Sequence, residues 1–560
     1  MANSGSAPRR ILYPGLPTPA QRMKFDAASR TFLLLLTGAI LLGLGYSFYR
    51  PLVLSIDSVY GFLAYKGTHS LQTFNQIDYV NAGNIDQIDH AFVSWWSPGQ
   101  WLFPAILNRL FGLRLGLASL WVTAACLLSG FTGFYRVFTR FGFSPTVSAL
   151  SLLLILAGST MYYSLLLYQG GEILEFGVFP WFLYFLIGLN RLTVLAWLLV
   201  FCGLFACFLA KTTLLLYGIL AVIAKAVEWM RRPSPRRSLA GAATLLAGPV
   251  LCLPVVFFAY LARGARPALF REFHLDGAAV LVPSSGPLIS VLSMQQWIIR
   301  LNRVFFTPDQ WAARVFPLAI YLIIFSALLF LVFKVSRMDA VSLSYKRFWM
   351  VLYLGLSAFF ILIYLFQANI DYSSRHFKLL GYLTLPGLLQ YAYSRTRPIR
   401  SQALVLILLL LAGSDFLYLK QKWTHNRYIS INYFYRNLDD LQNMDQLDEP
   451  AYRLLLYLDE SLPDRPGLPL LFYAEASEDL AIDLSHTCIT ERTALGNTGK
   501  QYRGKGPALV VCISKSTLSK DPGCLKRKFP DYDRFERLSE TANYMFYSGK
   551  FGDADLARSH

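Results

Sequence analysis

Residues 31–49 read TFLLLLTGAILLGLGYSFY, and residues 55–67 follow closely with SIDSVYGFLAYKG. The first run carries no charge and has roughly the 20-residue length that crosses the hydrocarbon core of a bilayer. The second contains Asp57, a carboxylate just beyond the end of the predicted membrane helix. Because an ionised carboxylate is costly in lipid, Asp57 is expected to face water, a partner or a substrate.

Long apolar runs recur along the chain and indicate its class. Of the 560 residues, 55% are hydrophobic and 15% are charged, and the mean hydropathy is +0.41, whereas a soluble protein carries roughly a quarter charged residues. The runs predict a polytopic α-helical membrane protein with about 11 transmembrane helices. They are Thr31–Tyr49, Leu113–Tyr135, Thr146–Leu167, Leu174–Leu189, Thr193–Leu209, Thr212–Val227, Leu239–Leu261, Val315–Val332, Phe348–Phe366, Leu379–Tyr393 and Ala403–Leu419.

The net charge of +18 gathers in short turns between these runs and in front of the first one. Basic turns on one side of a membrane follow the positive-inside rule, so these turns and the N-terminus are expected in the cytoplasm, and an odd number of spans places the C-terminus outside. The same distribution argues against a nucleic-acid partner. The basic residues are Arg9, Arg10, Arg22, Lys24, Arg30, Arg231, Arg232, Arg236, Arg237, Lys334, Arg337, Lys346, Arg347, Arg395, Arg397 and Arg400.

The chain therefore divides into three parts. We expect a cytoplasmic segment over 1–30, a transmembrane domain over 31–420 and an extracytoplasmic α/β domain over 421–560. The first apolar run has no convincing cleavage site after it and is expected to stay as an anchor. We expect a bacterial inner membrane rather than an endoplasmic reticulum, because the final Ala-Arg-Ser-His is not a retention signal.

The outer segments contain further predicted elements. The first outer loop, 51–112, has two helical patterns, Ser58–Lys66 and Gly99–Phe111, with a polar stretch between them. The third outer segment, Arg263–Arg314, mixes polar residues with Pro283-Ser-Ser-Gly-Pro287.

In the C-terminal tail, short apolar runs predict strands and a mixed charged and apolar run predicts a helix. The strands are Leu470–Ala474, Ala508–Ile513 and Tyr544–Tyr547, and the helix is Leu525–Leu538. In an oxidising compartment two of Cys488, Cys512 and Cys524 could pair, with Cys512 and Cys524 closest in sequence.

Two acids stand at the junction of the third and fourth runs. Glu172 and Glu175 are three residues apart, so in a helix they share one face. They follow Gly170 and Gly171, which permit a tight turn and the close approach of a ligand. A substrate-facing role competes with the ordinary role of first-turn acids, a favourable interaction with the helix dipole.

Four basic residues lie where the positive-inside rule does not put them. Lys211 interrupts an apolar stretch at an outer turn, where it either extends its ammonium group to the interface or binds a lipid phosphate. Arg375, His376 and Lys378 lie before the tenth run, in DYSSRHFK. Three basic residues beside the outer leaflet favour an anion site, with pairing to Asp371 or to acids of the first loop as the alternative.

His90 and Trp96 belong to a segment that is dense in aromatic residues. Most of its tryptophans suit the aromatic belt of a membrane interface. A wall on which a sugar stacks is the alternative.

These residues carry a resemblance. The pattern S-x-D-x-x-Y-x-x-L-A-x-x-G over residues 55–67 resembles the first acidic motif of the GT-C superfamily of integral membrane glycosyltransferases, which includes protein O-mannosyltransferases and the aminoarabinose transferases of lipid A. Trp96-Ser-Pro-Gly99 resembles the segment that follows that motif. Ala210-Lys211-Thr212 is similar to the lysine-bearing turn of the aminoarabinose branch, and Ser374-Arg375-His376 to an arginine segment before a late span. The resemblance covers about residues 31–420.

The resemblance implies an enzyme that uses a polyprenyl-phosphate sugar and inverts the anomeric centre. Asp57 would be the base, Glu172 would orient a substrate or support Asp57, and Lys211 and Arg375 would bind the lipid phosphate. The further substrate-binding candidates are His376, Lys378, Glu175, His90 and Trp96. The acceptor would be a glycan, a lipid or a protein. Asp57 has no second acid beside it in the sequence. This argues against a divalent metal but does not exclude one.

Two other classes of function remain. A flippase or transporter of a lipid-linked saccharide would carry polar residues near the middle of the bilayer on several helices, whereas the charged candidates here crowd the outer ends. A non-catalytic scaffold of the same fold is the other alternative.

Overall fold

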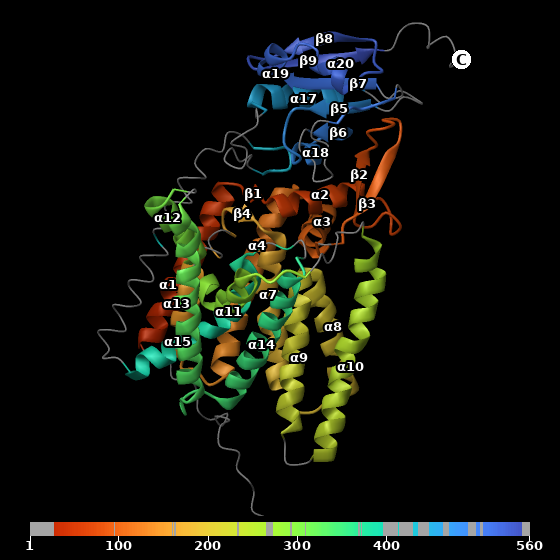
Figure 1. Ribbon diagram of the computed structural model, residues 1–560. Helices are drawn as coiled ribbons and strands as arrows, with labels where there is room; N and C mark the ends of the chain where they lie inside the picture. The colour runs from red at the N-terminus through yellow and green to blue at the C-terminus, as the bar shows by residue number, and fades with distance from the viewer. Residues whose placement is uncertain are drawn as a thin grey trace, which may run out of the picture.

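A bundle of long helices carries a small sheet domain at one end, and several short elements of the first loop lie between the two (Figure 1). The computed structural model describes residues 27–550 apart from 15 short segments. These segments are 95, 159–160, 162–163, 232–234, 265–272, 292–293, 308–309, 368–369, 371, 396–412, 414–428, 435–446, 463–469, 491–499 and 505–507.

Seven of the described helices are long and apolar enough to cross a membrane, which is the architecture of a multi-pass membrane protein. They are α1 (Ala27–Tyr49), α4 (Leu115–Arg140), α7 (Gly170–Gly188), α9 (Thr212–Met230), α10 (Pro235–Ala259), α13 (Trp311–Ser336) and α14 (Leu343–Leu365). Shorter helices complete the bundle: α5 (Pro145–Ala157), α8 (Val194–Ala210), η1 (Leu261–Arg263), α11 (Gly277–Val291), α12 (Met294–Phe305), η2 (Ser374–Phe377) and α15 (Lys378–Arg395). The predicted span Ala403–Leu419 lies outside the described residues.

Two parts of the bundle differ from the sequence-based prediction. In the predicted span Thr146–Leu167, helix α5 ends at Ala157, and the last residue of the span, Leu167, begins the strand β4 (Leu167–Tyr168). The third outer segment, in which no helix was predicted, contains α11 and α12. Its prolines and serines hid α11 from the apolar-run criterion, but Ser284 and Ser285 donate their hydroxyls to carbonyls one turn back, at 2.7 Å each, and so satisfy their polar groups inside the helix.

The first loop contributes β1 (Val53–Leu54), α2 (Ile56–Gly67), β2 (Gln76–Val80), β3 (Ile88–Phe92) and α3 (Gly99–Phe111). Both predicted helices are confirmed as α2 and α3. The polar stretch between them is an antiparallel hairpin of β2 and β3, which the sequence analysis missed. Strand β1 pairs in parallel with β4, which stands directly before α7.

The C-terminal part is a five-stranded sheet in the order β6-β5-β7-β9-β8, parallel among β6, β5 and β7 and antiparallel elsewhere. Its strands are β5 (Leu470–Ala474), β6 (Thr487–Thr490), β7 (Ala508–Ser514), β8 (Arg534–Glu540) and β9 (Tyr544–Lys550), and its helices are α17 (Glu449–Ser461), α18 (Leu480–Asp483), α19 (Lys515–Lys520) and α20 (Cys524–Lys528). Alternate residues of β5 enter two separate apolar cores, one on each face of the sheet. The hairpin residues Val80 and Ile85 complete one of these cores.

One expectation for the tail was wrong, and the pairing of its cysteines, which the sequence left open, can be described. The predicted helix Leu525–Leu538 is the short helix α20 followed by β8, because Phe529-Pro530 ends the helix. Cys488, Cys512 and Cys524 carry free thiols. Cys512 belongs to the core on one face of the sheet and Cys524 to the core on the other, so the pair that is closest in sequence is separated by the sheet.

Candidate functional site

The two-stranded ladder of β1 and β4 brings the first turns of α2 and α7 together. The Ser58 hydroxyl donates to the carbonyl of Tyr168 at 3.0 Å, and the Gly170 amide donates to the Ser58 hydroxyl at 3.3 Å. Asp57 and Glu172 both stand in the first turn of their helices. Two acids that are far apart in sequence therefore lie at one place in the fold.

Lys211 reaches this place from a break between two helices. It is both the C-cap residue of α8 and the N-cap residue of α9, and its backbone is extended, with φ −164° and ψ 138°. Its Nζ lies 2.9 Å from Glu172 Oε1 and 3.4 Å from Glu175 Oε2. A Cβ on Gly170 would lie 2.4 Å from the Gln100 Cβ, so this glycine is needed for the close approach of α3.

The remaining two cations come from the turn η2 and from the start of α15. Arg375 Nη1 lies 3.1 Å from Asp57 Oδ2, and Lys378 Nζ lies 3.1 Å from Glu175 Oε1. Glu175 thus lies between two ammonium groups. We call these six residues the charged cluster: Asp57, Glu172, Glu175, Lys211, Arg375 and Lys378.

The charged cluster has an accessible part and a buried part. The side chains of Arg375 and Asp57 are 38% and 30% exposed, whereas those of Glu175 and Lys378 are 3% and 1% exposed. Lys211 and Glu172 lie between these extremes. A ligand can therefore reach the Asp57–Arg375 pair first, and the Glu175–Lys378 pair serves as support beneath it.

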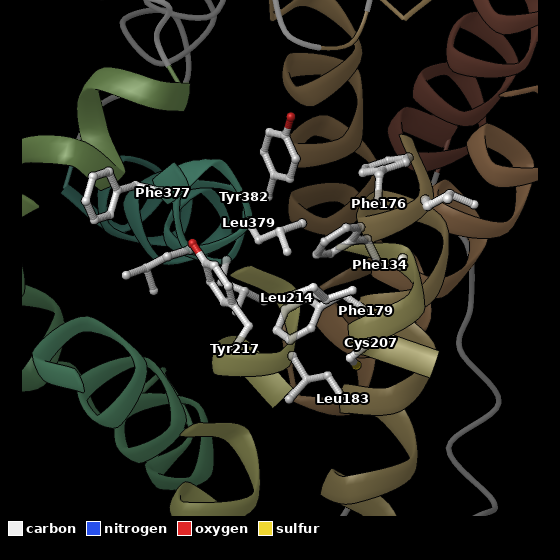
Figure 2. Packing of buried hydrophobic residues seen from close by; sticks show 14 of the residues in the cluster. Phe134, Phe176, Phe179, Leu183, Cys207, Leu214, Tyr217, Phe377, Leu379 and Tyr382 are labelled. Atoms are coloured by element: carbon white, nitrogen blue, oxygen red, sulfur yellow. The ribbon is translucent and has the colours of Figure 1, made fainter. Parts of the chain in front are cut away.

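Several apolar side chains near the charged residues in sequence belong to the buried core of the bundle. Phe176, Leu214, Phe377 and Leu379 are fully buried, and Figure 2 shows them among the packed side chains of α7, α9, η2 and α15. Charges close to a dry core interact more strongly than charges in water.

Electrostatic effects of opposite sign act on the pKa of Asp57. Burial raises the pKa of its carboxyl group above the usual value, the positive charge of Arg375 lowers it, and the negative charge of Glu172 raises it, with a net upward shift. A raised pKa suits a group that must take up a proton, because a general base works best with a pKa nearer to the working pH.

The other sequence candidates lie apart from these ion pairs. His376 is buried and stacks on Phe360 with ring centroids 5.1 Å apart. His90 is on the exposed hairpin, where its Nδ1 lies 2.7 Å from Asp78 Oδ1. Trp96 stacks on Tyr60 of α2 at 4.9 Å, one turn beyond Asp57.

The sequence analysis missed several residues that hold the charged cluster in place. The Gln100 side chain donates to the backbone oxygen of Asp57 at 3.3 Å, and the Tyr217 hydroxyl donates to the backbone oxygen of His376 at 2.9 Å. Gln100 directly follows the Trp96-Ser-Pro-Gly99 segment, which is a signal that could have identified it. Tyr217 lies in an apolar run that offers no such signal.

A divalent cation does not fit this donor set. Each of the three carboxylates already lies within 3.4 Å of an ammonium or guanidinium group, whereas a divalent metal needs carboxylates that are free to coordinate it. Across the part of the chain that the structure describes, no three His, Cys, Asp or Glu residues form a set that could hold a metal ion.

Comparisons with known proteins give distant structural neighbours. No protein-family model and no curated protein matches the chain. Similar solved structures include ArnT from Cupriavidus metallidurans in the apo state, with 12% identity, a TM-score of 0.42, and 93% of this chain and 98% of that chain covered. ArnT bound to undecaprenyl phosphate gives 11% identity, a TM-score of 0.42, and coverage of 92% and 98%.

The arabinofuranosyltransferase AftD from Mycobacteria gives 13% identity and a TM-score of 0.44 over 93% of this chain and 40% of that chain. ArnT and AftD are GT-C glycosyltransferases, the superfamily that the short motifs resemble.

Proposed function

We propose that the chain is a glycosyltransferase that moves a sugar from a polyprenyl-phosphate donor to an acceptor hydroxyl at the outer face of a bacterial inner membrane. One observation carries the proposal. The chain has long apolar helices, and its accessible ion pair of Asp57 and Arg375 lies in the same cluster as Lys211. Glu172 and Glu175 hold the Lys211 ammonium group. A base next to cations is what an attack by a hydroxyl with departure of a phosphate requires.

Arg375 and Lys211 would bind the donor phosphate. The planar guanidinium group binds two phosphate oxygens at once, and the ammonium group adds a point charge. Arg375 is the more exposed partner of its pair, so a phosphate can replace the Asp57 carboxylate on it. Donor binding would then release Asp57 for its own task, and the phosphate charge would raise the proton affinity of Asp57 further.

Asp57 would act as the base in a single displacement. Its carboxylate takes the proton of the acceptor hydroxyl while the hydroxyl oxygen bonds to the anomeric carbon. The bond from that carbon to the phosphate oxygen breaks, and the polyprenyl phosphate leaves with the electron pair. Arg375 and Lys211 stabilise the charge that develops on it. The configuration at the anomeric carbon is inverted.

The other members of the charged cluster would support these groups. Glu172 and Glu175 hold the Lys211 ammonium group, and Lys378 neutralises Glu175 from below. Trp96, stacked on Tyr60 near Asp57, is our candidate for contact with the sugar. His90 and His376 stay predictions for substrate contact.

The pH profile of the reaction tests the role of Asp57. Activity should fall as the pH drops through the Asp57 pKa, and kcat/KM should report this pKa in the free enzyme. The acid limb should lie above the ordinary aspartate value of about 3.9. Arg375→Gln removes a charge that lowers the pKa, and Glu172→Gln removes one that raises it. The limb should therefore move to higher pH in Arg375→Gln and to lower pH in Glu172→Gln.

Opposite shifts in these two variants are the signature of a carboxylate between the two charges. Arg263→Gln is the matched control, because the guanidinium group of Arg263 lies over the Phe92 ring, 4.7 Å from its centroid, and outside the charged cluster. This variant should leave the acid limb in place. If the acid limb stays in place in both test variants, another group titrates in it and Asp57 is not the base.

A further inference from the structure

Helix α2 links the charged cluster to the C-terminal domain. Asp57 stands in its first turn and Lys66 in its last turn. The two residues are nine positions apart, which corresponds to about 14 Å along the helix at 1.5 Å per residue. A hydrogen-bonded helix of this length moves as one piece, so whatever fixes Lys66 also limits the position of Asp57.

The Lys66 ammonium group is held by the C-terminal domain. Its Nζ donates to the backbone oxygens of Ala481 at 2.8 Å and His486 at 3.3 Å, and also to that of Leu484. These contacts use all three donors of an ammonium group. Burial lowers the pKa of Lys66, which agrees with a group that is largely withdrawn from water.

The carbonyl-bearing loop is itself fixed to the domain by a buried carboxylate. Asp459 of α17 accepts hydrogen bonds from the Ser485 amide at 2.7 Å and the Ser485 hydroxyl at 2.8 Å. It also accepts one from the His486 amide at 3.1 Å and lies 2.8 Å from His486 Nδ1. A continuous set of contacts therefore runs from α17 through this loop and Lys66 into α2.

We propose that Lys66 is a positioning residue through which the C-terminal domain holds Asp57 opposite Arg375. The inference rests on the proposed function, in which Asp57 is the base. It assigns the domain a part in the reaction: the domain fixes the angle of α2, and a domain that is detached from Lys66 leaves the base misplaced. A misplacement of about 1 Å is enough to cost roughly 100-fold in rate.

Hydrogen exchange on the full-length chain tests the link directly. In Lys66→Met, amides of residues 56–67 should exchange at least about tenfold faster than in the wild type, because α2 opens more readily without its anchor. The matched control is Lys526→Met, since Lys526 also donates to a backbone oxygen, that of Tyr532, but within the domain. That variant should leave exchange in 56–67 unchanged.

The kinetic arm separates positioning from general stability. With an undecaprenyl-phosphate sugar that the wild type uses, Lys66→Met should lower kcat roughly 10- to 100-fold and leave KM for the donor unchanged. Lys66→Arg keeps donors for the same carbonyls and should recover most of kcat. Lys526→Met should keep the wild-type kcat even where its thermal midpoint falls as far as that of Lys66→Met.

Two results would overturn the inference. Wild-type exchange in 56–67 of Lys66→Met means that Lys66 does not hold α2, and faster exchange with an unchanged kcat means that the hold does not position the base. Failure of the proposed function looks different: the wild type then transfers no sugar from any donor, while exchange in Lys66→Met still rises.

Discussion

Replacing Asp57 by asparagine is expected to lower kcat for sugar transfer by about 10²–10⁴-fold, the usual contribution of a general base. Asparagine has the shape of aspartate and still offers an oxygen to Arg375, which lies 3.1 Å from the carboxylate, but it cannot take a proton. Binding of undecaprenyl phosphate should therefore persist. The measurements are kcat with a labelled donor and the affinity for undecaprenyl phosphate alone.

The control for this variant is a carboxylate with a guanidinium partner outside the charged cluster. Glu449 lies 2.6 Å from Arg453 on the exposed face of α17, and Glu449→Gln should keep the wild-type kcat. Full activity in Asp57→Asn would show that another group removes the acceptor proton.

Lys211→Met is expected to have two separable effects. It leaves Glu172 without its 2.9 Å partner and Glu175 with Lys378 alone, and breaking a buried ion pair costs about 3–5 kcal/mol of stability. It also removes a proposed ligand of the donor phosphate. The thermal midpoint and the affinity for undecaprenyl phosphate should both fall.

A double variant separates the two effects. In Lys211→Met with Glu172→Gln the uncompensated charge is gone, so most of the lost stability should return while binding of undecaprenyl phosphate stays weak. Lys225→Met is the matched control on the same helix, because the buried Lys225 ammonium group donates to the Ile187 carbonyl at 3.1 Å, away from the charged cluster. It should cost stability and leave binding unchanged. Recovery of both properties in the double variant would make Lys211 purely structural.

Much of the charged cluster could be predicted from sequence for one physical reason. A charge beside an apolar run is expensive, so Asp57, Lys211 and Arg375 stand out as soon as the runs are marked. Their pairing could not be predicted, because it depends on the parallel ladder of β1 and β4, strands of two residues each. Such short strands leave no periodic pattern in a sequence.

Other parts were hidden because local patterns and tertiary contacts disagree. The hairpin β2–β3 reads as a polar loop, yet Val80 and Ile85 enter a core of the C-terminal sheet. Helix α11 contains Pro283 and Pro287, residues that rarely stand inside a helix, so its sequence offered no helical signal. In the sequence, His376 lies between Arg375 and Lys378, which both belong to the charged cluster. In the structure, however, its ring stacks on Phe360.

The most direct test of the central claim is an assay of purified wild-type protein in proteoliposomes with a panel of labelled undecaprenyl-phosphate sugars and a mixture of glycan, lipid and protein acceptors. The proposed function predicts that at least one sugar leaves its lipid and appears on an acceptor with inverted anomeric configuration, and that Asp57→Asn suppresses this transfer. Labelled lipid that stays intact and moves from one leaflet to the other would contradict the claim and identify a flippase instead.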